Sequence, residues 1–153
     1  MTPSLHALLV LIHLAGVIVW VGGMVFAQFA LRPAAMQVLE PPKRLPLMAQ
    51  ALGRFFHLVA IAVVAILLTG WALLANVGMA QAPVAWHVML TVGVVMALMF
   101  AFIYFRLTPA LCAAVAASQW PVAGAALNRI RVLILINLCL GAVAVAAAVL
   151  ARA

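Results

Sequence analysis

The chain has 153 residues, of which 71% are hydrophobic and 6% are charged. Soluble domains contain about 25% charged residues, so this composition cannot build a polar shell and indicates a protein of the lipid bilayer. Glu40 is the only acidic residue, which excludes chemistry based on paired carboxylates and metal sites built from them. The formal net charge is +7, but the basic residues form no dense patch with interleaved aromatic residues, so nucleic acid is excluded as a partner.

Four apolar stretches are long enough to cross the hydrocarbon core, which requires about 20 helical residues. They cover about residues 4–31, 55–75, 84–105 and 132–150. Apolar and polar residues do not alternate within them, so they are predicted to be helices rather than strands of a barrel. The connections are short, which predicts antiparallel neighbours. We therefore predict an all-α fold over residues 1–153, a single polytopic membrane domain that forms a four-helix up-down bundle.

Basic residues indicate the orientation of this bundle. Seven of them fall in two connections, with Arg32, Lys43, Arg44 and Arg54 between the first two stretches and Arg106, Arg129 and Arg131 between the last two. The connection between the second and third stretches has none. The positive-inside rule then predicts that both basic connections face the cytoplasm and that both termini lie outside.

Histidines are the main candidates for chemistry, because ionisable side chains within membrane spans are costly and usually functional. His13 precedes Arg32 by 19 residues, and His87 precedes Arg106 by 19 residues. The first and third helices run in the same direction, so both histidines are expected roughly 28 Å from the level of their arginines. The sequence thus predicts that His13 and His87 share one depth near the outer surface.

Two kinds of metal centre suit this pair. Diagonal helices of a bundle lie about 11–14 Å apart, so His13 and His87 could bind the iron of haem b from both sides, with Trp20 lining the pocket. This is the favoured hypothesis, a b-type redox protein or haem-dependent oxidoreductase whose partner is a quinone or a periplasmic electron carrier. Alternatively the same pair, with His6 and a thioether such as that of Met89, could bind copper, because sulfur and imidazole suit Cu(I).

A third hypothesis is an accessory subunit without a cofactor. His57 lies three residues after Arg54, at the opposite end of the predicted bundle from the other histidines, and under the copper hypothesis it could be a step of a transport path together with Met96 and Met99. The bilayer is the expected partner in every case, and a homo-oligomer is a further option.

The stretch HLAGVIVWVGG, from His13 to Gly23, resembles the opening helix of the CopD (copper resistance D) family. The segments LRPAAMQVLEPPKRLPLMAQALGRFF, WHVMLTVGVVMALMF and IRVLILINLCLG resemble small stand-alone members of this family in Gram-negative bacteria. The resemblance covers most of the chain. It implies a multi-pass protein of the bacterial inner membrane that binds copper or transports it across the membrane, with a periplasmic copper partner.

A more distant resemblance is to the HemJ-type protoporphyrinogen oxidases, four-helix membrane proteins that bind haem b. The first-helix histidine of that family, which precedes a Trp-x-x-Gly pattern, falls on His13, followed by Trp20 and Gly23. The histidine of its third helix falls on His87, and Met89 stands where that family has a lysine. This resemblance implies a haem site on His13.

Overall fold

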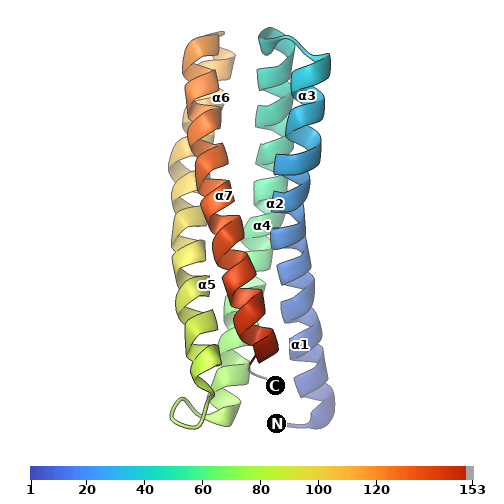
Figure 1. Ribbon diagram of the computed structural model, residues 1–153, viewed down its shortest axis with the longest axis vertical. Coiled ribbons are helices and arrows are strands. Elements are labelled where there is room, and N and C mark those ends of the chain that lie inside the picture. Colours follow the sequence, from blue (N-terminus) through green and yellow to red (C-terminus); the bar gives the residue numbers. More distant parts are fainter. Residues whose placement is uncertain (151–153) are drawn as a thin grey trace.

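A computed structural model describes residues 1–150, and these residues fold into helices joined by short connections (Figure 1). The helices form four continuous rods, each long and apolar enough to span a membrane. The predicted all-α, four-helix membrane fold is therefore confirmed.

The first rod joins five segments, in which η denotes a π-helix: α1 (Pro3–Val17), η1 (Ile18–Gly22), α2 (Gly23–Phe26), η2 (Ala27–Leu31) and α3 (Arg32–Val38). The second rod is α4 (Pro41–Val77). The third rod comprises α5 (Val84–Phe102), η3 (Ile103–Leu107) and α6 (Thr108–Ala116), and the fourth is α7 (Trp120–Leu150).

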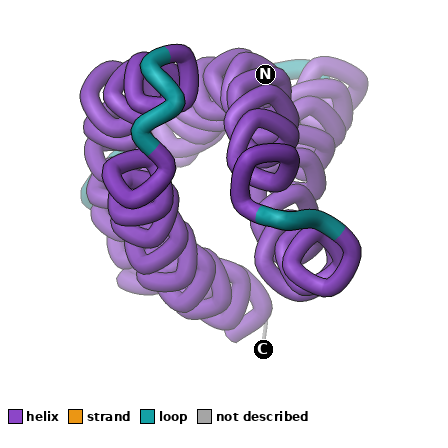
Figure 2. Tube along the Cα trace, turned by 90° about the horizontal axis from the view of Figure 1, so that it is seen from above, coloured by secondary structure: helices purple, strands orange, loops and turns teal. Residues whose placement is uncertain are grey.

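Met1 and the end of α7 lie at one end of the molecule, which we call the terminal end (Figure 1). The α3–α4 and α6–α7 connections lie at the opposite end, which we call the basic end because most of the Lys and Arg residues lie toward it. Seen along the long axis, these two connections lie apart, on opposite sides of the bundle (Figure 2).

The rods extend beyond the predicted spans at the basic end. Between the first two rods, only Leu39 and Glu40 remain outside helices. Pro41 and Pro42 do not interrupt the chain there, because they occupy the first turn of α4, where a backbone N–H has no helical partner. The helix bounds thus differ from the predicted spans, and the membrane boundaries themselves stay a prediction.

Two π-helical segments allow prolines inside the rods. Pro33 follows η2, and Pro109 follows η3, by two residues in each case. A proline ring clashes with the carbonyl one turn earlier, and the wider π turn provides the room that this requires. At η3 the Thr108 hydroxyl also donates a hydrogen bond of 3.0 Å to the Ile103 carbonyl. The rods therefore continue through positions where a proline usually ends a helix.

The four rods pack as two close pairs, α1 with α4 and α5 with α7. Three buried rings join rods across the centre of the bundle. Phe100 contacts Trp20 edge to face with centroids 6.1 Å apart, and it contacts Phe56 in the same way at 6.0 Å. These contacts link the first three rods at one level.

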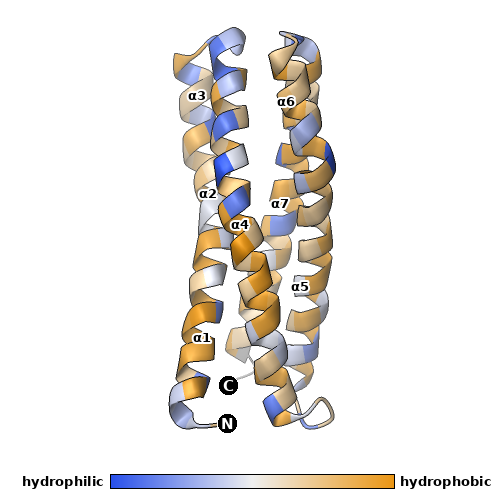
Figure 3. Ribbon diagram, turned by 180° about the vertical axis from the view of Figure 1, so that it is seen from behind, coloured by the Kyte–Doolittle hydropathy of each residue, from blue (hydrophilic) through white to orange (hydrophobic). Residues whose placement is uncertain are grey.

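Large apolar side chains cover the outside of all four rods, where Figure 3 shows long hydrophobic faces. Examples are Ile18, Leu68, Leu98 and Val143, one from each rod. Exposed apolar surface of this extent is unfavourable in water, so these faces contact the lipid bilayer.

Gly16 lies at the closest approach of α1 and α4. A Cβ atom at this position would lie 2.7 Å from Ile66 Cγ1 and 3.3 Å from the Ala62 carbonyl oxygen. We expect Gly16→Ala to push the two helices apart and to destabilise the protein by about 1–3 kcal/mol. Gly22→Ala is the matched control, since nothing lies within 4 Å of its Cβ position. Thermal unfolding in detergent should separate the two variants, and an equal loss in both would contradict the packing argument.

Candidate metal centre

His13 lies on α1 and is half-buried against α4. Its Nδ1 atom is 3.0 Å from Thr69 Oγ1. The Thr69 hydroxyl donates its single hydrogen to the Ala65 carbonyl oxygen at 2.6 Å, so its oxygen accepts the bond from His13. His13 Nδ1 therefore carries the hydrogen of the neutral ring, and Nε2 keeps a free lone pair.

The backbone of α4 also holds the His13 ring in place. Gly70 follows Thr69, and a Cβ atom at Gly70 would lie 3.2 Å from His13 Cε1. The absence of a side chain there lets the ring lie against the helix. Metal-binding histidines usually donate their second ring N–H to an oxygen, which fixes both tautomer and orientation. His13 has this arrangement, with Nε2 as the nitrogen available to a metal ion.

The contact between Trp20 and Phe100 shows how the first and third rods are aligned. Because their ring centroids lie 6.1 Å apart, the two residues are at nearly the same level. His13 precedes Trp20 by seven residues, whereas His87 precedes Phe100 by 13. By this contact His87 would lie farther toward the terminal end than His13, whereas Val21 and Met96, which both approach Gly141, give nearly equal depths for the two histidines.

The shared depth that the sequence predicts therefore stays a prediction. The prediction treats Arg32 and Arg106 as markers of one boundary, but the third rod continues through α6 to Ala116, whereas the first ends at Val38. The two arginines therefore need not lie at one level. The first rod packs along α4 and the third along α7, so the structure does not bring the two histidines together.

The other predicted ligands are also separate. His6 is exposed in α1, and His87 and Met89 are half-buried near the start of α5. Within the described part of the chain, no three His, Cys, Asp or Glu side chains form a group that could hold a metal ion. The expected cluster of His13, His87 and His6 is therefore not formed.

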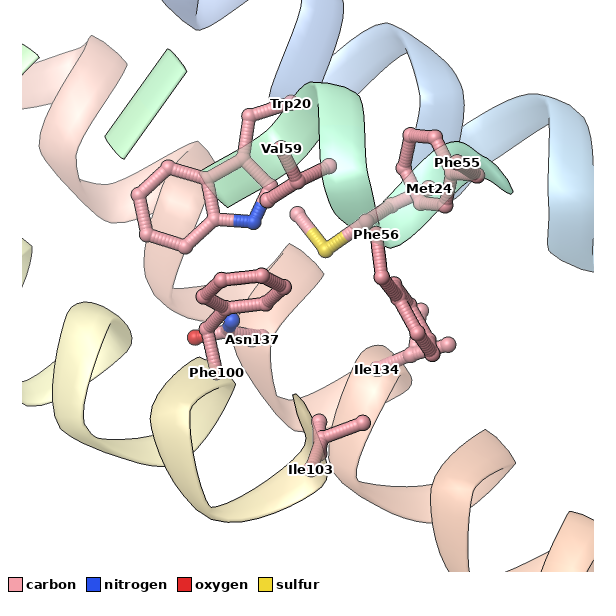
Figure 4. Close-up of a pocket in the computed structure, with 9 residues that line it drawn as sticks. All are labelled: Trp20, Met24, Phe55, Phe56, Val59, Phe100, Ile103, Ile134 and Asn137. Carbon is pink, nitrogen blue, oxygen red and sulfur yellow. The ribbon is translucent and has the colours of Figure 1, made fainter. Parts of the chain in front are cut away.

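Trp20, the predicted lining residue, belongs to an internal pocket in the centre of the bundle (Figure 4). The lining residues come from all four rods and are Trp20, Met24, Phe55, Phe56, Val59, Phe100, Ile103, Ile134 and Asn137. None of them is a histidine. Trp20 therefore lines a pocket that is distinct from the surroundings of His13.

Asn137 is the polar member of this pocket and is 1% exposed. Its Nδ2 donates a hydrogen bond of 3.4 Å to the Met96 carbonyl, but its Oδ1 is buried without a partner. An unsatisfied buried acceptor costs about 1–3 kcal/mol. Asn137 and the Met24 thioether are therefore the members of this lining that carry heteroatoms besides Trp20 (Figure 4).

Three of the eight methionines are buried in the core, namely Met24, Met48 and Met96. Met96 and Val21 both approach Gly141, and Asn137, which lines the central pocket with Met24, donates to the Met96 carbonyl. Met48 lies nearer the basic end, in a second pocket. Soft sulfur donors thus occur at several levels inside the bundle.

His57 has local contacts instead. It is exposed on α4, its Nδ1 lies 2.6 Å from the Gly53 carbonyl one turn earlier, and its ring packs edge to face on Tyr104. It lies near the middle of α4, twelve residues from the Thr69 that contacts His13, and not at the opposite end of the bundle.

Thr69 is the residue that the sequence does not single out. It is buried and is the hydrogen-bond partner that orients His13. The available signal is its position, since it is a hydroxyl residue within the apolar stretch that covers about residues 55–75. The partner helix and register that give it this role depend on tertiary packing.

Comparison with known proteins identifies the family. No curated protein and no solved structure matches this chain. Residues 49–151 match a family model described as copper resistance protein D. The match spans the second to fourth rods, and the rod that carries His6 and His13 lies outside it. Because it covers about two thirds of the residues, the chain belongs to the CopD family.

Proposed function

We propose that this protein binds copper as its cargo, with His13 as the principal ligand, and passes it toward thioethers in the centre of the bundle. The observation that carries the proposal is the hydrogen bond from His13 Nδ1 to Thr69, which leaves Nε2 available to a metal ion. Membership in the copper resistance D family supports copper as the metal.

The available donors suit Cu(I) better than harder ions. Glu40 is the only carboxylate side chain, and it is exposed beyond the end of α3, so calcium or magnesium would lack their preferred oxygen ligands. Imidazole and thioether groups, by contrast, are favourable ligands for Cu(I).

Haem has less support than copper. An axial pair must face each other across the iron, whereas the described contacts of His13 are with Thr69 and Gly70 of α4. The first and third rods do not form one of the close pairs, and no histidine lines either of the two internal pockets. The family is a copper resistance family, so neither the geometry nor the comparison favours haem b.

The buried methionines extend the proposal from binding to transport. Met24 lines the central pocket and the Met96 carbonyl accepts a hydrogen bond from Asn137 of that pocket, and each methionine is less than 5% exposed. Asn137 Oδ1 adds an unpaired acceptor to the same pocket. A Cu(I) ion that leaves His13 would therefore find soft donors in a core that is otherwise apolar.

The predicted orientation places His13 toward the periplasm, so a periplasmic copper donor is the proposed partner, in the inner membrane of a bacterium. An accessory subunit without copper is the competing proposal. The two proposals differ in what the purified protein binds.

Anaerobic titration of detergent-purified protein with Cu(I), against a chromophoric chelator, tests the function. We expect the protein to take stoichiometric copper from the chelator and to show a featureless visible spectrum after dithionite. A Soret band that persists after purification from haem-supplied cells would support haem instead. Failure to compete for copper, with no Soret band, would leave the accessory role as the better explanation.

A further inference from the structure

A second pocket lies at the basic end, between the first, second and fourth rods. Its lining residues are Ala27, Gln28, Arg32, Met48, Leu52, Leu127, Ile130, Arg131 and Ile134. Two of these nine residues are arginines and none is acidic, which distinguishes this pocket from the apolar one in the centre of the bundle.

Hydrogen bonds indicate that Arg32 and Arg131 lie at similar depths along the bundle. Gln28 Nε2 donates to the Arg131 carbonyl at 2.8 Å, which aligns these residues across the first and fourth rods. Arg131 Nη1 donates to Asn128 Oδ1 at 3.3 Å, so the guanidinium extends back toward the basic end. Arg32 lies one turn from Gln28 in that same direction. Arg32 and Arg131 both line the pocket, and the charge of Arg131 acts on Arg32, so the two guanidinium groups lie close enough to interact.

The chain does not neutralise this charge itself. Arg32 and Arg131 are half-buried, and the charged groups that act on Arg32 are Arg131 and Arg44, both of the same sign. The sequence has eight Lys and Arg residues but a single acidic side chain, that of Glu40, which is exposed. Like charges that are partly removed from water repel one another more strongly than they would in solution.

We infer that this pocket binds a phosphate group between Arg32 and Arg131, supplied by the headgroup of an anionic phospholipid or by free phosphate. Arginine forms paired, charge-assisted hydrogen bonds with phosphate oxygens, and basic pockets between membrane helices on the cytoplasmic side suit anionic headgroups. Gln28 helps to position Arg131, because its side-chain amide donates a hydrogen bond to the Arg131 backbone carbonyl.

Native mass spectrometry of the full-length protein tests the inference, with phosphatidylglycerol and phosphatidylcholine as probes. At roughly 0.15 M salt, which screens exposed charges, we expect phosphatidylglycerol to be retained about tenfold better than phosphatidylcholine. Inorganic phosphate is tested separately, by its effect on thermal unfolding. A gain in stability with phosphate, together with no preference between the two lipids, would identify free phosphate as the ligand of the same site.

Charge-matched variants locate the site. Arg32→Gln with Arg131→Gln should abolish the preference, whereas Arg54→Gln with Arg129→Gln removes two exposed charges and should retain it within about twofold. Equal losses in both pairs would show general surface attraction and overturn the inference. The inference would also be overturned if the wild-type protein neither preferred phosphatidylglycerol nor gained stability with phosphate. This outcome does not depend on whether any variant folds.

Discussion

Replacing His13 with alanine is expected to weaken copper binding by more than about a hundredfold, because it removes the ligand itself and not only its support. The fold should survive this change. His13 is half-buried, and its one side-chain hydrogen bond is to Thr69, whose hydroxyl also donates to its own helix. Competition with a chromophoric chelator for Cu(I) measures the affinity, and circular dichroism checks the helix content.

Thr69→Val provides the graded test of the same site. It keeps the branched shape but removes the acceptor for His13 Nδ1–H, and loss of such a supporting group typically costs about 10–100-fold in metal affinity. His57→Ala is the matched control, because this histidine is exposed on α4 and contacts the Gly53 carbonyl and Tyr104. If His13→Ala and His57→Ala bind copper equally well, the metal is not at His13.

The number, type and approximate centres of the helices could be predicted from the sequence, because hydropathy over about 20 residues is a local property. The helix ends could not. Pro33 and Pro109 indicate breaks when they are considered alone, yet each is accommodated by a π-helical segment immediately before it. That accommodation depends on how the rest of the rod packs, which local patterns do not contain.

The metal centre was predictable only in part. His13 was identifiable as a polar residue within an apolar span, but Thr69 and Gly70 become its neighbours only through the packing of α1 on α4. The pairing of His13 with His87 assumed that two arginines lie at one level. That assumption depends on the register between the first and third rods, for which the Trp20–Phe100 contact and the approach of Val21 and Met96 to Gly141 give values that differ by about five residues. A small change in register therefore decides whether two residues that sequence spacing pairs share a level.

The two proposed sites affect each other through charge. A copper ion that moves inward from Met24 would approach Met48, which lines the same pocket as Arg32 and Arg131. The uncompensated guanidinium charge opposes any cation there. A phosphate group bound between the arginines would reduce that repulsion, so anionic lipid should favour passage of copper through the basic end.

Replacing Met24 and Met96 together with leucine is expected to reduce copper transfer across a proteoliposome membrane by about tenfold or more, because leucine has no soft donor for Cu(I). Binding at His13 should remain, since neither methionine lies at its level. Stability should also remain, because exchange of Met for Leu in a core conserves volume and usually costs less than about 1.5 kcal/mol. Transfer is measured with a copper-sensitive dye inside the vesicles.

The control pair is Met36→Leu with Met99→Leu, which removes one exposed and one half-buried thioether outside the buried core. It changes the same number of sulfur atoms, so it separates a specific route from a general loss of copper affinity. Equal transfer by both pairs would mean that the buried methionines only fill the core, as methionines often do. Loss of binding and transfer together in the Met24 and Met96 pair would instead place these thioethers in the initial site with His13.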